Sequence, residues 1–288
     1  MAPVVFHLIS LKSTSDKEAF ISALKSFSPD ERPLWVASCH HWIHEPRISV
    51  TALTGSGHSI QAWDYVVIFR SPSPTTPELP LVLQPYVACN WSITAEVQDA
   101  MIDSLSSRNA ATEAETAPPL PAGWTADNHE SIDAAQGAPD VELSLETPSR
   151  AFGSDKSDSG SALKEVIRDI GLAHPGPVAM LNLLAYLPGQ RPRYMEYVAA
   201  FQETIGPKYG GQPLLAGFGV TDWSSRAEEV VGGREVGEWE DAALVWYPTV
   251  WHFGKMIDDP MYVTLDRQHK GGVIRDNPLI CCSEISLD

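Results

Sequence analysis

The feature that most constrains the fold of this chain is an internal repeat. Each half opens on an apolar run that begins with Pro-Val, PVVFHLISL at 3–11 and PVAMLNLLAYL at 177–187. Apolar residues spaced as on one face of a helix follow both runs, at 16–27 in the first half and at 191–206 in the second. A repeated order of this kind indicates two similar structural units, each with an apolar face to bury.

The rest of each half contains three segments with the composition of β-strands, and each has a counterpart in the other half. The corresponding segments are 33–42 and 213–223, 62–72 and 238–248, and 85–94 and 278–287. Before the last strand the second half adds a helical pattern at 250–271, whereas the first half has a proline-rich segment. This order is the βαββαβ, ferredoxin-like plan. We therefore predict an α+β fold of two tandem ferredoxin-like units, packed sheet to sheet as an intramolecular α+β barrel.

The segment between the repeats has a different composition. Residues 105–160 are rich in Ser, Ala, Pro, Gly, Asp and Glu and contain few large apolar side chains. Such a segment cannot bury enough surface to offset the entropy lost on ordering, so we predict an acidic linker. The predicted domains are an N-terminal half at 1–104, the linker at 105–160, and a C-terminal half at 161–288. The last of these begins with an extra helix at 161–176.

The charge of the chain excludes one class of partner. The formal net charge is −17, whereas binding of nucleic acid requires clustered Lys and Arg. No apolar run approaches the length of about 20 residues that a membrane span requires, and the N-terminus lacks the basic start of a signal peptide. The four cysteines, Cys39, Cys89, Cys281 and Cys282, are too few for a disulfide framework. We therefore predict a cytoplasmic protein with neither a nucleic-acid nor a membrane partner.

Motifs spread along the second half resemble those of a known superfamily: LNLLAY at 181–186, Tyr194, Tyr197, Gly210-Gly211, Trp239, Tyr247-Pro248, DDPMY at 258–262, and Arg267. With these motifs, this half is similar to the dimeric α+β barrel superfamily, and in particular to its DUF1330-like and EthD-like families. The first half lacks the Gly-Gly pair and the DPxY motif, so a functional site is expected in one half only. The resemblance implies small-molecule chemistry, because the superfamily includes cofactor-free monooxygenases, muconolactone-isomerase-like enzymes, polyketide cyclases, dehydratases and haem-degrading enzymes.

The stretch CHHWIH at 39–44 looks like a metal site, with three histidines and a cysteine in a row of six residues. In a strand, side chains alternate, so His40, Trp42 and His44 would share one face while Cys39 and His41 share the other. His40 and His44 would then lie about 13 Å apart, too far to share a zinc ion. We therefore predict no metal here. Either His40 or His41 is a candidate general base at the mouth of a cavity, and the alternative is a solvated strand end.

Two polar residues interrupt otherwise apolar strands. His7 lies within the first strand of the first half, and Asn182 takes the matching place in the second half. Because a buried polar group is costly unless it is hydrogen-bonded, each marks either a core hydrogen bond or the floor of a ligand cavity. His252, near a predicted helix start, is a further candidate base, since a helix N-terminus disfavours the cationic imidazole. The alternative for His252 is an exposed position without a role.

The candidates for substrate binding are aromatic or polar side chains of the predicted strands and helices: Trp42, Tyr194, Asp222, Trp246, Tyr262 and Arg267. Tyr262 and Asp266 are four residues apart, so both could face the sheet from one side of a helix. Tryptophans suit either a barrel core or the lining for an apolar ligand. Arg267 could equally pair with a nearby acid such as Asp258.

These features predict a small-molecule enzyme without a cofactor that acts on an apolar aromatic or polyketide-like compound. The reaction would be proton transfer, in an isomerase, cyclase, dehydratase or cofactor-free monooxygenase, with His7, His40 or His41 as the base. Asn182 or a tyrosine would orient the substrate. The alternative is a non-catalytic ligand-binding or scaffold protein of the same fold, and a haem or metal protein is a third reading. The halves would form a pseudo-dimer within one chain, with or without a further homodimer.

Overall fold

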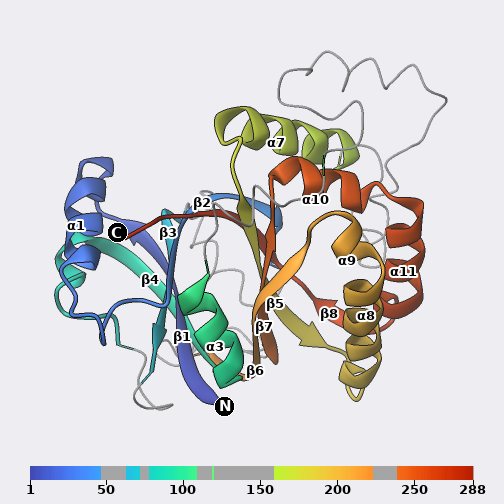
Figure 1. Ribbon diagram of the computed structural model, residues 1–288, viewed down its shortest axis with the longest axis horizontal. Coiled ribbons are helices and arrows are strands. Elements are labelled where there is room, and N and C mark those ends of the chain that lie inside the picture. Colours follow the sequence, from blue (N-terminus) through green and yellow to red (C-terminus); the bar gives the residue numbers. More distant parts are fainter. Residues whose placement is uncertain (47–62, 72–77, 109–118, 120–158, 223–238, 288) are drawn as a thin grey trace, which may run out of the picture.

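The computed structural model describes residues 1–46, 63–71, 78–108, 119, 159–222 and 239–287 (Figure 1). Its strands are β1 (Ala2–Leu11), β2 (Trp35–His44), β3 (Tyr65–Arg70), β4 (Val87–Val97), β5 (Val178–Tyr186), β6 (Gln212–Asp222), β7 (Asp241–Tyr247), β8 (Ile274–Asp276) and β9 (Leu279–Glu284). Its helices are α1 (Lys17–Lys25), α3 (Asp99–Ser107), α7 (Ser159–Ala173), α8 (Arg191–Glu203), α9 (Ile205–Lys208), α10 (Val250–Ile257) and α11 (Pro260–Lys270).

All the strands except β8 form a closed antiparallel barrel. They follow the order β7-β6-β4-β1-β3-β2-β9-β5, and β5 pairs back to β7. The two halves of the chain join along β4 and β6, where Val97 lies opposite Gly217, and along β2 and β9, where Cys39 lies opposite Cys282. The short strand β8 pairs with the end of β5. Each barrel strand therefore has a neighbour on both sides, which removes the free sheet edges.

The prediction of a ferredoxin-like, dimeric α+β barrel with two sheets packed face to face is wrong. The edge strands of the two halves pair with each other, so one continuous barrel replaces two stacked sheets. The halves are also not two βαββαβ units. Between β3 and β4, the described residues form only the 3-10 turn η2 (Gln84–Tyr86), where the plan requires a helix. The sequence patterns identified which strand faces are apolar. How these faces are buried depends on the pairing of the edge strands of one half with those of the other, which closes the barrel.

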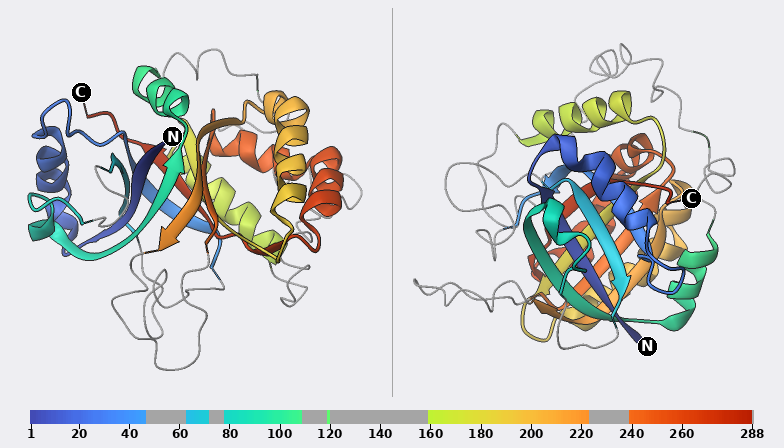
Figure 2. Two further views of the ribbon diagram at one scale, coloured as in Figure 1. Left: turned by 90° about the horizontal axis from the view of Figure 1, so that it is seen from below. Right: turned by 90° about the vertical axis from the view of Figure 1, so that its left-hand side faces the viewer.

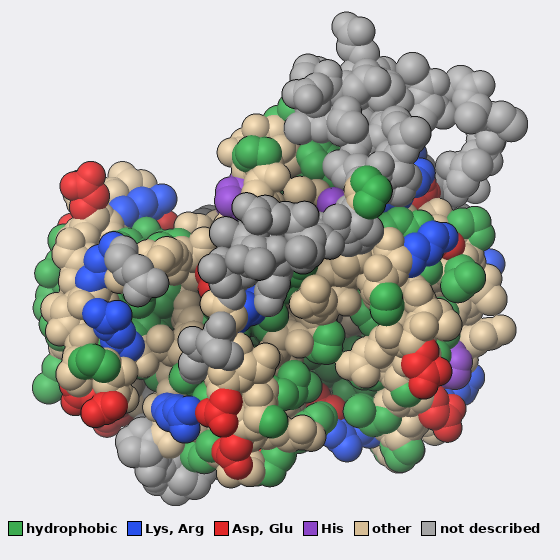
Figure 3. Space-filling model, viewed as in Figure 1, with side chains coloured by type: hydrophobic (Ala, Val, Ile, Leu, Met, Phe, Trp, Pro, Cys, Tyr) green, Lys and Arg blue, Asp and Glu red, His purple; other side chains and the backbone are tan. Residues whose placement is uncertain are grey.

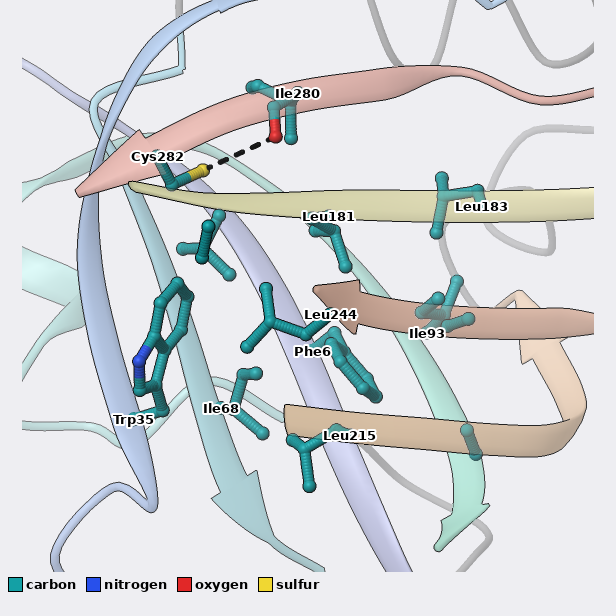
Figure 4. Close-up of a cluster of buried hydrophobic side chains, with 14 of the residues drawn as sticks. Phe6, Trp35, Ile68, Ile93, Leu181, Leu183, Leu215, Leu244, Ile280 and Cys282 are labelled. Atoms are coloured by element: carbon teal, nitrogen blue, oxygen red, sulfur yellow. Dashed lines mark hydrogen bonds between the residues drawn. The ribbon is translucent and has the colours of Figure 1, made fainter. Parts of the chain in front are cut away.

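The barrel interior is filled by apolar side chains from both halves (Figure 4). Phe6, Trp35 and Ile68 come from the first half, and they meet Leu181 and Leu244 from the second. All five are at most 3% exposed. Burial of this shared apolar surface holds the two halves together, and it leaves the outer faces of the strands to be covered by helices.

Helices cover the outer faces of the two halves unequally. On the first half, Phe20 and Leu24 of α1 pack against Val67 of β3. On the second half, α8, α10 and α11 lie on the opposite side of the barrel from α1 (Figures 1 and 2). The predicted extra helix is α7, and it packs on α10. The contact is close: a Cβ added to Gly171 of α7 would lie 2.3 Å from Cε2 of Trp251 in α10.

The helix predicted at 250–271 is in fact two helices. α10 ends at Ile257, and α11 begins at Pro260, whose ring lacks the N–H that a continuous helix would need. Asp259 caps the second helix, because its Oδ1 accepts a hydrogen bond of 2.7 Å from the backbone N–H of Met261. The chain therefore turns at Asp259, and α11 runs alongside α8.

The predicted linker at 105–160 lies mostly outside the described residues. Its first residues belong to α3 and its last to α7. The domain boundaries therefore stay a prediction. Of the helices in the described ranges, none combines the length and the apolar character needed to cross a membrane.

Candidate functional site

A cavity of about 830 Å³ lies between the second half of the barrel and its helices. One wall comes from β5, β6 and β7, and the opposite wall comes from α8, α10 and α11. Much of the lining is made of large apolar side chains, among them Met180, Leu184, Met195, Phe201, Phe253 and Met256. A cavity of this size and lining fits a small, largely apolar molecule.

Strand alternation decides which side chains face this cavity. In β5, Leu181 and Leu183 belong to the barrel core, whereas Asn182 and Tyr186 line the cavity on the outer face. The same alternation in β7 brings Asp241 to the cavity wall. Adjacent strands therefore place a phenol and a carboxylate side by side.

Asp241 is a buried acid of the cavity, only 4% exposed. Its Oδ2 accepts hydrogen bonds from the Tyr186 hydroxyl at 2.9 Å and from Nε of Arg191 at 2.8 Å. Its Oδ1 is buried and has no hydrogen-bond partner among the described residues. An unpaired buried acceptor is costly, so Oδ1 is a position where a hydrogen-bond donor of a ligand would be stabilised.

Four tyrosines that line the cavity remain protonated. Burial raises the pKa of Tyr186, and neighbouring Tyr194 and Asp241 raise it further. Burial also raises the pKa values of Tyr194, Tyr197 and Tyr262. The ring centroids of Tyr186 and Tyr194 are 5.2 Å apart, and those of Tyr194 and Tyr197 are 5.5 Å apart. At neutral pH these hydroxyls are therefore hydrogen-bond donors and not bases.

A buried ion pair lines the cavity from α11. Nζ of Lys270 lies 2.9 Å from Oδ1 of Asp266, and the two side chains are 17% and 2% exposed. The same Nζ lies 4.5 Å from the ring centroid of Tyr197 and 5.8 Å from that of Tyr262. Burial by itself lowers the pKa of Lys270, but the Asp266 carboxylate raises it well above its usual value. Lys270 is therefore a cation at the cavity wall.

Gly210 and Gly211, which precede β6, occupy positions where a side chain would be strained or would clash. Gly210 has a φ of 67°, in the left-handed region that glycine adopts without strain. A Cβ on Gly211 would lie 2.9 Å from Cε1 of Tyr247, which lines the cavity. The Tyr247 hydroxyl in turn donates to Sδ of Met256 at 3.4 Å. The glycines therefore allow the chain to approach a cavity tyrosine closely.

Four of the predicted site residues line this cavity together. They are Asn182, Tyr194, Tyr262 and Arg267. Asn182 is held by hydrogen bonds, since its Nδ2 donates to the Met180 carbonyl at 3.1 Å and its Oδ1 accepts from Asn277 at 3.4 Å.

Asp222, also predicted to bind substrate, lies at the end of β6, where its backbone is opposite Ile93 of β4. Its side chain lies outside the described part of the structure. Trp42 and Trp246 belong to the barrel core and are not among the residues that line the cavity. The Trp246 ring packs instead against the guanidinium of Arg108, whose Cζ lies 5.2 Å from the ring centroid.

The CHHWIH stretch forms the end of β2, but its side chains do not alternate strictly. The pairing of β2 with β9 shifts between Cys39 and His41, so Cys39 and Trp42 both pack in the barrel interior. Our assignment of these two to opposite faces was therefore wrong. His40 contacts Oγ of Ser283 and His41 is exposed, and neither lines the cavity. His44, which we had not selected, does line it.

The remaining histidine candidates are packed away from the cavity. His7 is 1% exposed, and its Nδ1 lies 3.1 Å from Oδ1 of Asn90. Burial lowers the pKa of His7 to about 4, although the Asn90 hydrogen bond acts in the opposite direction. His252 is also buried, and its Nδ1 lies 2.9 Å from Oγ1 of Thr249, the N-cap of α10. Within the described residues, no three His, Cys, Asp or Glu side chains are grouped so that they could hold a metal ion.

The sequence analysis did not select Tyr186, Lys270 or Asp241 as site residues, although periodicity could have indicated the first two. Tyr186 lies four residues beyond Asn182 in the same strand, and because side chains alternate with a period of two, both point to the same face. Lys270 lies four residues beyond Asp266, which, with Tyr262, could face the sheet from one side of a helix, so Lys270 would share that side. Asp241 gave no such signal, because an acid at the start of a strand usually marks a solvated end.

No protein-family model matches this chain, and no curated protein does. Two crystal structures align with part of it. One is a protein of unknown function from Rhodopseudomonas palustris, RPA0582, at 22% identity and a TM-score of 0.33, covering 46% of this chain and 96% of the other. The second is methylated RPA0582, at 24% identity and a TM-score of 0.30, covering 38% and 82%. The resemblance to the DUF1330-like and EthD-like families therefore stays a prediction.

Proposed function

We propose that the cavity of the second half binds an apolar aromatic or polyketide-like compound and that Asp241 accepts a proton from it, without a cofactor. The observation that carries this proposal is that Asp241, whose buried Oδ1 has no hydrogen-bond partner among the described residues, lines a large and mostly apolar cavity. Oδ2 already accepts hydrogen bonds from Tyr186 and Arg191, whereas Oδ1 has no partner among the described residues, so Oδ1 is the oxygen left to accept a proton. This replaces the histidines as candidate bases, since His7, His40, His41 and His252 do not line the cavity.

A binding test uses two matched ring compounds, 2-naphthol and naphthalene, which differ by one hydroxyl donor. The intact chain should bind 2-naphthol more tightly, because its O–H can donate to Asp241 Oδ1. In the Asp241→Asn variant, Arg191 and Tyr186 should hold the amide oxygen at the Oδ2 position, which turns the NH2 group toward the cavity. The advantage of 2-naphthol should then shrink. An equal preference in both proteins would contradict the assignment of Oδ1 as the ligand acceptor.

A reaction test measures proton transfer directly. The aromatic ketone 1-tetralone is incubated with the chain in D2O, and deuterium uptake at the carbon next to its carbonyl is followed by mass spectrometry. The chain should accelerate uptake, and Asp241→Asn should reduce that acceleration by about a hundredfold, the usual size of a general-base contribution. Glu203→Gln, at an exposed acid that does not line the cavity, is the control for the loss of one negative charge.

The second candidate function is non-catalytic binding in the same cavity. It is favoured by the two hydrogen bonds that Arg191 and Tyr186 donate to Asp241, because they hold the carboxylate in one orientation, as a fixed acceptor for a ligand donor. Selective binding of 2-naphthol without any enzyme-dependent deuterium uptake would decide for this alternative.

We further propose a cytoplasmic location and a small molecule as the partner, without nucleic acid or membrane. The net charge of −17 and a visible surface on which acidic and basic side chains are intermixed support the part of this proposal that excludes nucleic acid (Figure 3). Whether two such chains form a homodimer is tested by light scattering of the purified protein.

A further inference from the structure

Lys270 carries more hydrogen-bond donors than its neighbours can satisfy. An ammonium group has three N–H donors, and the polar partner recorded for it in the described residues is one carboxylate, that of Asp266. Its other close contacts are the ring faces of Tyr197 and Tyr262, which attract the cation but leave N–H directions for a further acceptor. Because Lys270 lines the cavity and its side chain is 17% exposed, that acceptor can come from a ligand.

The surroundings of Lys270 favour an anion over a neutral acceptor. The wall contributes apolar and aromatic side chains such as Met195 and Phe201, so water is displaced when the cavity fills. In such an environment a charge-assisted hydrogen bond is stronger than one between neutral groups. Arg267 also lines the cavity but is exposed, so solvent screens its charge more than that of Lys270.

We propose that the ligand of this cavity is an organic anion, an apolar ring compound that places a carboxylate or another acidic oxygen group on Lys270. The inference rests on the proposed function, since it names the charge of the molecule that the cavity binds. It also gives the cavity two distinct polar ends, an acceptor at Asp241 and a cationic donor at Lys270. Lys270 has the role of a specificity-determining residue.

The test compares two fluorescent probes with the same ring skeleton. One is 1-anilinonaphthalene-8-sulfonate, which is an anion, and the other is N-phenyl-1-naphthylamine, which lacks the sulfonate. The Kd of each probe is measured by fluorescence for the intact chain and for Lys270→Met, which keeps much of the side-chain length but removes the charge. In Lys270→Met, the anionic probe should bind about tenfold or more weakly, while the neutral probe should change by less than about twofold.

Further variants separate a specific loss from unfolding. Lys270→Met leaves Asp266 as an unpaired buried charge, so the double variant Asp266→Asn with Lys270→Met removes both charges together. It should show the same selective loss of the anionic probe. Lys255→Met, at a lysine that does not line the cavity, should leave both Kd values unchanged.

Three outcomes would overturn the proposal. One is that the double variant binds the anionic probe as tightly as the intact chain does. Another is that Arg267→Met, rather than the Lys270 variants, causes the selective loss. The third is that the probes do not bind in this cavity, shown either by no binding at all or by Kd values that Ala243→Trp, a substitution in the cavity wall, leaves unchanged. This third outcome also removes the proposed function, whereas the first two leave neutral-ligand binding in the cavity intact.

Discussion

His7 should make the stability of the fold depend on pH. Folding lowers its pKa from 6.5 to about 4, mainly through burial. The unfolded chain therefore binds a proton at His7 in a pH range where the folded chain does not. The stabilising difference is fully present above the unfolded pKa of 6.5, and it is lost as the pH falls from there toward 4.

The size of this effect follows from the two pKa values. Between about pH 7 and about pH 5, the unfolded state gains roughly 2 kcal/mol relative to the folded state through His7 alone. The ring is 1% exposed, so solvent screening gives no reason to reduce this figure. His7→Gln can keep a hydrogen bond to Asn90 and does not titrate, which makes it the matched variant.

Urea denaturation of both proteins at the two pH values measures the difference. The intact chain should lose about 2 kcal/mol more free energy of unfolding than His7→Gln does on going to the lower pH. Other acid-sensitive groups contribute equally to both proteins and cancel. Equal losses in the two proteins would refute the argument, because His7 would then titrate alike in the folded and unfolded chains.

Two further predictions concern the packing of the barrel. Sγ of Cys39 and Sγ of Cys282 lie 4.0 Å apart on paired strands of the two halves, so copper-phenanthroline oxidation should join them in a disulfide that peptide mapping detects; a disulfide from Cys282 to Cys89 instead would contradict the β2–β9 pairing. Gly171→Ala should lower the melting temperature although alanine favours helices by about 1 kcal/mol, because the added Cβ would meet Trp251. Trp251→Phe in the same chain should recover part of that loss, and a higher melting temperature for Gly171→Ala alone would contradict the packing of α7 on α10.

Much of the secondary structure could be predicted from the sequence, because it depends on local patterns. Alternating or continuous apolar runs predicted strands at 3–11 and 177–187, which are close to β1 and β5. The closure of the barrel could not be predicted in this way. It depends on hydrogen bonds between residues far apart in sequence, such as those along β4 and β6, and local composition does not encode them.

The candidate site was predictable only where a strand or helix period placed a residue. Asn182 was selected because it interrupts an apolar strand, and Tyr262 because it lies four residues before Asp266 in a predicted helix; both line the cavity. His7 stands out equally, yet it bonds to Asn90 outside the cavity, since a polar residue in a strand is satisfied as readily by a neighbouring strand as by a ligand. The unpaired oxygen of Asp241 is a three-dimensional property that the sequence does not reveal.

The most direct test of this account is a crystal structure of the chain with 2-naphthol bound. The account predicts the ring between the outer face of β5 and β7 and the helices α8 and α11, with the hydroxyl within hydrogen-bond distance of Asp241 Oδ1. A ring bound inside the barrel beside Trp35 and Leu181, or at His40 on the end of β2, would contradict it.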